Sequence, residues 1–197
     1  MLNEKLKNHH LILASGSPRR QEFFKSLGLE FEVRLKPVKE EYPPRLTHFE
    51  ISNYLAQLKA LPFKNDLNPK DILITSDTIV WHENMALGKP RDSDEAFSIL
   101  KSLSDKTHEV ITSVCFTMTN YEKTLHNITK VTFKALSDEE ITYYVKTFKP
   151  FDKAGAYGIQ EWIGQIGVSK IEGSYFNVMG LPIHLVYKTL NSIVDSH

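Results

Sequence analysis

Two hydroxyl groups and two guanidinium groups lie within one short segment near the N-terminus, residues 15–20, Ser-Gly-Ser-Pro-Arg-Arg. Ser17 can cap a helix whose first residue would be Pro18, and the free N–H groups at such a helix end attract anions. Gly16 lets an anion approach the backbone, and arginine forks suit phosphate oxygens. The segment therefore fits a phosphorylated ligand, although it lacks the G-x-x-x-x-G-K-[ST] spacing of a P-loop. An ordinary capped helix with two solvated arginines fits the same residues, and this segment alone leaves both interpretations open.

A carboxylate, Asp77, follows a short apolar run at residues 72–75 that is typical of a buried strand. Carboxylates at strand ends often face a ligand site in α/β folds. Asp77 could there hold a hydrated magnesium ion or orient a water molecule. The alternative is a strand-end aspartate whose oxygens accept hydrogen bonds from nearby backbone N–H groups.

Three lysines lie beside expected turns or helix ends: Lys59 closes an expected helix, Lys89 stands in Gly-Lys-Pro, and Lys153 in Asp-Lys-Ala-Gly. A triphosphate carries roughly four negative charges and commonly a divalent metal, so it needs cations from several elements. Each lysine taken singly could equally be a solvated surface group. Glu40, in the polar loop at residues 36–44, has the same alternative.

Composition disfavours several classes of protein. The single cysteine, Cys115, can form neither an internal disulfide nor a thiolate zinc cluster, and no H-E-x-x-H or G-x-S-x-G pattern occurs. Lys plus Arg and Asp plus Glu are both 24, so the net charge is zero, whereas nucleic-acid-binding proteins usually carry a basic excess. No apolar run approaches the roughly 18 residues of a membrane span. We expect a cytoplasmic protein with no nucleic-acid partner and no membrane contact.

The elements that would position these residues follow from the apolar pattern. With 197 residues, 41% of them apolar, the chain suits one domain over 1–197, in which 1–10 is a polar N-terminal extension. Short strands interspersed with amphipathic helices indicate an α/β or α+β fold with a mixed sheet. Residues 137–140 form a capping-box pattern. We expect helices at about 18–27, 47–60, 93–103, 138–148 and 182–194, strands at about 11–14, 31–35, 72–75, 79–81, 109–118 and 128–134, a hairpin turn at 82–87 and an irregular glycine-rich stretch at 152–167.

In their order and spacing, these segments resemble the Maf family of nucleoside triphosphate pyrophosphatases, also described as septum-formation inhibitor proteins. The resemblance runs from about Leu11 to the last helix, which is nearly the whole chain. The matching stretches include residues 13–20 (LASGSPRR), 58–60 (LKA), 77–80 (DTIV), 88–90 (GKP), 107–110 (THEV), 136–141 (LSDEEI), 152–160 (DKAGAYGIQ), 173–175 (GSY) and 180–182 (GLP).

This resemblance implies hydrolysis of a nucleoside triphosphate to the monophosphate and pyrophosphate, with Mg²⁺ or Mn²⁺ as the divalent metal. It implies an elongated α/β fold, a mixed central sheet flanked by helices in two lobes with a cleft, shared with the inosine triphosphate pyrophosphatases. Residues 157–160 resemble the branch that takes dTTP and UTP, whereas the branch that favours 7-methyl-GTP has a glutamate where Gln160 stands. A homodimer is also expected from the resemblance.

The resemblance also implies roles for the candidate site residues. Asp77 matches the aspartate assigned as the proton acceptor, and it could instead act mainly as a metal ligand. Glu40 matches a family glutamate near the phosphates and is the expected second metal ligand. Arg19, Thr78 and Gln160 match positions assigned to base selection. The other candidate substrate-binding residues are Ser15, Ser17, Arg20, Lys59, Lys89 and Lys153.

Two other classes of function remain as alternatives. A non-catalytic nucleotide-binding regulator of cell division would use the same anion site without chemistry, although the presence of Asp77 together with Lys89 favours catalysis. A module that binds DNA or RNA is disfavoured by the zero net charge and by the lack of an interleaved aromatic and basic stripe.

Overall fold

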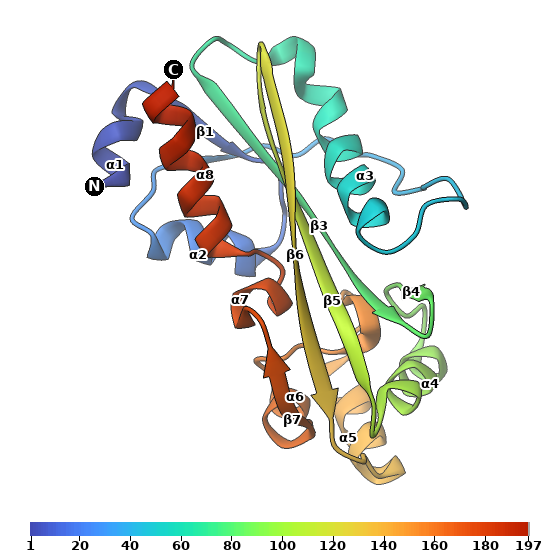
Figure 1. Cartoon of the computed structure of the whole chain (residues 1–197). Coiled ribbons are helices and arrows are strands. Elements are labelled where there is room, and N and C mark those ends of the chain that lie inside the picture. Colours follow the sequence, from blue (N-terminus) through green and yellow to red (C-terminus); the bar gives the residue numbers. More distant parts are fainter. Residues whose placement is uncertain (197) are drawn as a thin grey trace. The chain divides into compact units, whose positions relative to one another are not determined.

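The structure, a computed structural model, describes residues 1–196, and within them seven strands form one sheet (Figure 1). Their order is β2-β1-β3-β5-β6-β7, with β4 paired to β3. β1 is parallel to β2 and to β3, whereas β4 is antiparallel to β3 and β7 is antiparallel to β6, so the predicted mixed sheet is confirmed. The strands are β1 (His10–Leu13), β2 (Glu32–Val33), β3 (Asp71–His82), β4 (Met85–Leu87), β5 (Thr107–Met118), β6 (Tyr121–Phe133) and β7 (Val168–Glu172).

Three of the longer helices begin at residues whose side chains cap them. Ser17 caps α2 with Pro18 as its first residue, Asp92 caps α4, and Ser137 and Glu140 form both hydrogen bonds of the capping box at α5. The helices are α1 (Leu2–Lys5), α2 (Pro18–Ser26), α3 (Phe49–Ala60), α4 (Ser93–Leu103), α5 (Asp138–Phe148), α6 (Trp162–Gly167), α7 (Tyr175–Val178) and α8 (Ile183–Ser196), with 3₁₀ turns η1 (Leu6–Asn8), η2 (Leu61–Asp66) and η3 (Ala154–Ala156).

The chain divides into two compact units, and the division falls within β3, β5 and β6. The first unit comprises Met1–Asp77, Thr112–Asn127 and the C-terminal residues from Gly180. The second unit comprises Thr78–Ile111 and Ile128–Met179. The single domain expected over 1–197 stays a prediction.

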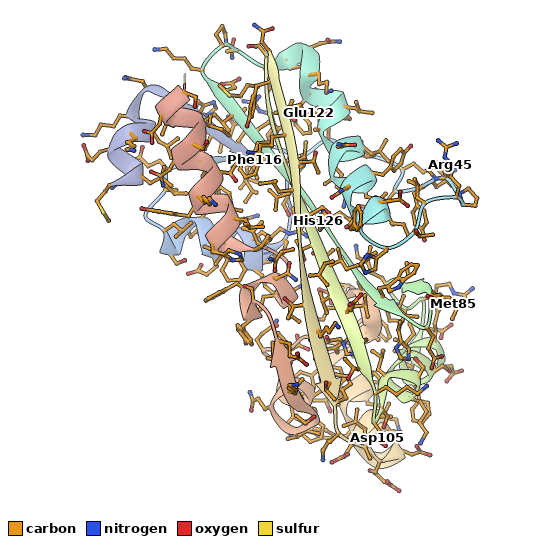
Figure 2. All side chains as sticks on the ribbon, viewed as in Figure 1. Arg45, Met85, Asp105, Phe116, Glu122 and His126 are labelled. Carbon is orange, nitrogen blue, oxygen red and sulfur yellow. The ribbon has the colours of Figure 1, made fainter. Side chains whose placement is uncertain are left out.

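In the first unit the sheet is buried on both faces. On one face, α3 and η2 cover Ile12, Leu73 and Cys115, and Phe63 fills this cluster. Figure 1 shows α2 and α8 on the other side of the sheet from α3. Because both faces are covered, β3 is buried without interruption from Asp71 to Asp77 rather than at alternate residues. Phe116 of β5 is also fully buried (Figure 2).

In the second unit α4, α5 and α6 pack on the sheet around one apolar cluster. Leu100 of α4, Tyr144 of α5 and Ile163 of α6 are fully buried in it, together with Val131 and Phe133 of β6. The loop that follows α5 contributes Ala156, Tyr157 and Ile159 to the same cluster, so its backbone is held against the core.

Several elements differ from the sequence-based expectation. Residues 72–75 and 79–81 belong to one unbroken strand, β3, and β6 begins at Tyr121 rather than at about 128. The early part of β6 is only partly buried, so its sequence lacks an apolar alternation. Strand β4 forms within the expected hairpin turn, and strand β7 forms where no element was expected. Each is a strand because it pairs with an earlier one, β4 with β3 and β7 with β6. Within the expected polar extension, α1 and η1 form and bury Leu2 and Leu6.

Candidate active site

The anion-binding segment predicted at residues 15–20 forms a tight turn into α2. Ser17 accepts a hydrogen bond from the backbone N–H of Arg20 at 3.5 Å, and Ser15 Oγ accepts one from the N–H of Ser17 at 3.3 Å. Ser15 is buried, whereas Ser17 and Arg19 are half-buried. Two serine hydroxyls therefore stand at the positive end of a nine-residue helix, which is an arrangement that favours an anion.

Arg20 differs from the phosphate fork that its sequence position suggests, because its guanidinium is already bonded within the first unit. Nε donates to the carbonyl oxygen of Gly180 at 2.8 Å, and Nη1 donates to the carbonyl oxygen of Ser76 at 3.0 Å and to Ser15 Oγ at 3.4 Å. Burial lowers the pKa of Arg20, with the charge of Asp77 acting against that shift. Arg20 thus ties the serine turn to the strand residue that precedes Asp77.

Asp77 lies at the end of the buried run of β3, and its carboxylate is paired with Lys59 at the end of α3. Lys59 Nζ donates to Asp77 Oδ1 at 2.7 Å and lies 3.1 Å from Glu40 Oε2. The Asp77 side chain is 8% exposed, that of Lys59 19% and that of Glu40 46%. The sequence predicted all three residues for the site, and the structure brings them together around one ammonium group.

The environment of Asp77 makes its carboxylate more basic than an ordinary aspartate. Burial raises the pKa of Asp77, while the positive charges of Lys59 and Arg20 act against the rise and the negative charge of Glu40 adds to it. A carboxylate with a raised pKa accepts a proton from water more readily, which suits a general base.

The carboxylates around Lys59 are the candidate ligands of a divalent metal. Across residues 1–196, no group of three or more His, Cys, Asp or Glu side chains gathers at one point. Glu40 and Asp77 nevertheless offer two carboxylates that converge on one cation, the Lys59 ammonium. Mg²⁺ is commonly held by one or two carboxylates together with substrate phosphates and waters, so this pair fits such an ion.

The second unit holds the remaining candidate residues. Thr78 is its first residue and is half-buried in β3. The N–H of Gly155 donates to the carbonyl oxygen of Gly88 at 3.1 Å, which brings the turn that carries Lys89 beside η3. Lys89 is exposed, whereas Lys153 is 9% exposed and pairs with Asp152 at 2.7 Å.

Two residues that the sequence analysis did not select organise the segment that carries Lys153 and Gln160. Glu161 Oε1 lies 3.2 Å from Lys153 Nζ, and Glu161 Oε2 accepts a hydrogen bond from the hydroxyl of Tyr144. The one sequence signal was the position of Glu161, a carboxylate directly after the expected base-selecting Gln160. Tyr144 lies on the apolar stripe of α5, so its position in the sequence did not indicate a polar contact for its hydroxyl.

The candidate residues thus form two groups, one in each unit. The first unit gathers Ser15, Ser17, Arg19, Arg20, Glu40, Lys59 and Asp77, and the second holds Thr78, Lys89, Lys153 and Gln160. As for the membrane, none of the helices in the described part of the chain is long and apolar enough to cross one.

Known proteins resemble the chain over almost all of its length. Residues 10–193 match the family described as Maf-like protein. A protein of Flavobacterium johnsoniae named dTTP/UTP pyrophosphatase is 61% identical over 98% of this chain and all of its own length, and one of Christiangramia forsetii with the same name is 58% identical over the full length of both. In fold, the chain is similar to the Staphylococcus aureus Ham1 protein, with a TM-score of 0.54, 16% identity and coverage of 93% of this chain and 98% of that chain. The family match over residues 10–193 and the identity to full-length relatives show that this chain belongs to the Maf family.

Proposed function

We propose that this chain is a nucleoside triphosphate pyrophosphatase that hydrolyses dTTP and UTP to the monophosphate and pyrophosphate. The observation that carries the proposal is the buried carboxylate of Asp77, paired with Lys59 and tied through Arg20 to the serine turn. The names of the relatives at 61% and 58% identity support the choice of dTTP and UTP as substrates.

Hydroxyl groups and a lysine of the first unit are assigned to the triphosphate. Ser15, Ser17 and the positive end of α2 suit phosphate oxygens, and Lys59, paired with Asp77, supplies a further ammonium. Arg20 positions this turn through its bonds to backbone carbonyls and adds positive charge. Lys89 and Lys153 are assigned the same phosphate-binding role on the strength of their positions in the family motifs.

The chemical step is water attack on the α-phosphorus. The water oxygen forms a bond to phosphorus, the bond from that phosphorus to the α–β bridging oxygen breaks, and pyrophosphate leaves with that oxygen. The proton of the attacking water passes to the Asp77 carboxylate, whose pKa is raised by burial. Preorganised cations stabilise the charge that develops on the phosphate oxygens, and such preorganised groups typically supply a large share of catalysis.

A divalent metal ion, Mg²⁺ or Mn²⁺, is proposed to bind to Asp77 and Glu40 together with the triphosphate. When bound, it would supply Lewis-acid neutralisation of phosphate charge. The two carboxylates converge on Lys59 Nζ at 2.7 and 3.1 Å, which supports their ability to share a cation.

Base selection is assigned to Arg19, Thr78 and Gln160. An arginine and an amide can meet the acceptor and donor groups on the edge of a uracil or thymine ring, and a threonine hydroxyl can both donate and accept. Support for these roles comes from the family motifs that contain the three residues.

The test is a pyrophosphate-release assay on the purified chain with Mg²⁺ and a panel of dTTP, UTP, dCTP, GTP and 7-methyl-GTP. We expect release of pyrophosphate, with the highest kcat/KM for dTTP and UTP. Preference for 7-methyl-GTP would overturn the substrate assignment. Binding of nucleotide without any pyrophosphate would instead favour the non-catalytic regulator.

A further inference from the structure

The segment from Lys153 to Gln160 contains two consecutive residues with left-handed backbone conformations. Gly155 and Ala156 both have left-handed backbone conformations, with φ of 70° and 59°, and Ala156 has no glycine freedom to adopt one at low cost. Such a conformation persists only where the surrounding structure determines it. Side chains outside the segment are therefore needed to hold its conformation.

The carboxylate of Glu161 contacts the first residue of this segment, Lys153, and is linked through the Tyr144 hydroxyl to Gly158. Oε1 lies 3.2 Å from Lys153 Nζ, and Oε2 accepts from the Tyr144 hydroxyl. The Tyr144 oxygen in turn accepts a hydrogen bond from the backbone N–H of Gly158 at 3.0 Å. Tyr144 is fully buried in α5, so the network is fixed to the core of the second unit.

The packing around Gly158 supports the same conclusion. A Cβ atom at Gly158 would lie 2.8 Å from the Glu161 Cδ atom and 3.0 Å from both of its carboxylate oxygens. The Glu161 N–H also donates to the carbonyl oxygen of Gly158 at 2.9 Å. The carboxylate is thus folded back onto the segment, so that a side chain at position 158 would displace it.

We propose that Glu161 is a positioning residue that, with Tyr144, fixes the 153–160 segment and so sets the placement of Gln160 for base selection and of Lys153 for phosphate binding. This inference rests on the proposed function, because Lys153 and Gln160 are substrate-binding residues only under that proposal. The second carboxylate near Lys153, that of Asp152, has a side chain 66% exposed, whereas that of Glu161 is 20% exposed. Exposed pairs contribute little to ordering, so Glu161 is the partner that directs the Lys153 ammonium.

The test compares Tyr144→Phe with Tyr143→Phe, a matched control one residue away on the same helix. Tyr143 is 50% exposed, so loss of its hydroxyl leaves the network intact. Tyr144→Phe removes the group that joins Glu161 to the N–H of Gly158. Two readouts are taken: hydrogen exchange of the backbone amides at 153–160, and the ratio of kcat/KM for dTTP to that for dCTP, which carries an amino group in place of a ring carbonyl.

We expect Tyr144→Phe to speed amide exchange in 153–160 by about tenfold or more and to lower the dTTP-to-dCTP ratio by about tenfold, the scale on which a misplaced contact group acts. Tyr143→Phe should change neither. Glu161→Gln keeps the size of the side chain but loses its charge beside Lys153, which is assigned to phosphate, so it should lower kcat/KM for dTTP and dCTP alike. Its further effect on their ratio, through Tyr144, should not add to that of Tyr144→Phe when the two are combined.

Two results would overturn the inference. Unchanged exchange in Tyr144→Phe would show that the hydroxyl does not hold the segment. Faster exchange in Tyr144→Phe with an unchanged nucleotide ratio would mean that the network is structural only. If the unaltered chain hydrolyses no nucleotide, the proposed function fails, and the exchange readout then decides by itself whether Glu161 and Tyr144 fix the segment.

Discussion

Lys59 Nζ lies 2.7 Å from Asp77 Oδ1, and it is the same ammonium that lies 3.1 Å from Glu40. One lysine therefore pairs with two carboxylates, of which the Asp77 carboxylate is the more deeply buried. A buried charge is tolerated only when it is paired, so the Asp77 carboxylate depends on Lys59 for its ionised state in the folded chain.

Replacement of Lys59 by glutamine is expected to destabilise the chain. Breaking a buried ion pair costs about 3–5 kcal/mol, and the partial exposure of Lys59 and Glu40 reduces this to about 1–3 kcal/mol. Urea unfolding at pH 7 measures the change. Lys64→Gln is the matched control, because Lys64 pairs at 2.7 Å with Glu122, labelled in Figure 2, whose side chain is more exposed than that of Asp77. Loss of this exposed pair should cost no more than about 0.5–1 kcal/mol. Equal losses in the two variants would contradict the buried pair.

The same Lys59→Gln variant is expected to bind Mn²⁺ more tightly than the unaltered chain when no nucleotide is present. The ammonium stands where Glu40 and Asp77 converge, so it competes with a second cation for their oxygens. Titration followed by the electron paramagnetic resonance of free Mn²⁺ gives the Kd directly. An unchanged or weaker Kd would argue against a metal held by this pair.

The acid stability of the chain should depend on His108. This residue is 2% exposed, its Nε2 lies 2.7 Å from the Tyr157 hydroxyl, and burial, with a smaller contribution from His82, lowers its pKa to about 3. A histidine with a lowered folded-state pKa binds its proton in the unfolded chain first. Its contribution is therefore fully present above about pH 6.5 and is lost as the pH falls toward 3, at about 1.4 kcal/mol per pH unit.

The measurement for His108 is the free energy of unfolding between pH 7 and pH 4, for the unaltered chain and for His108→Gln. Glutamine keeps an amide that can bond the Tyr157 hydroxyl but does not titrate in this range. We expect the difference between the two proteins to shrink or change sign in favour of glutamine as the pH falls. Parallel pH profiles would show that His108 is not held neutral.

The assigned role of Gln160 predicts that its substitution changes the base preference. Gln160→Glu replaces an amide, which both donates and accepts, by a carboxylate that only accepts, so the uracil or thymine edge loses a donor. We expect kcat/KM for dTTP to fall by about tenfold or more relative to that for GTP. The measurement is the pyrophosphate assay with both nucleotides, and an unchanged ratio would remove Gln160 from base selection.

Local signals in the sequence predicted the parts of the site that are made by neighbouring residues. Ser17 and Pro18 start α2 as expected, because a cap and a first-turn proline act within one helical turn. The apolar run 72–75 placed Asp77 at the end of a buried stretch, and the structure agrees. The serine turn and the strand-end carboxylate were therefore available from residue order alone.

Contacts between residues far apart in the chain could not be predicted from residue order. The bonds from Arg20 to the carbonyl oxygens of Ser76 and Gly180 join residues far apart in the chain, and any carbonyl could have accepted them. Likewise the Tyr144–Glu161 bond joins a residue in an apolar helix stripe to a residue in an irregular loop. Strand β7 was missed for the same reason, because its pairing with β6 rather than its exposed sequence makes it a strand.

The central claim is that the Asp77 carboxylate carries turnover, and Asp77→Asn tests it most directly. The amide keeps the shape of the side chain and can still meet Lys59 through its carbonyl oxygen, but it cannot accept the proton of the attacking water. With dTTP and Mg²⁺, the variant is predicted to release pyrophosphate about 100- to 10,000-fold more slowly, the usual contribution of a general base, while equilibrium binding of a non-hydrolysable dTTP analogue persists. Pyrophosphate release at the rate of the unaltered chain would contradict the claim.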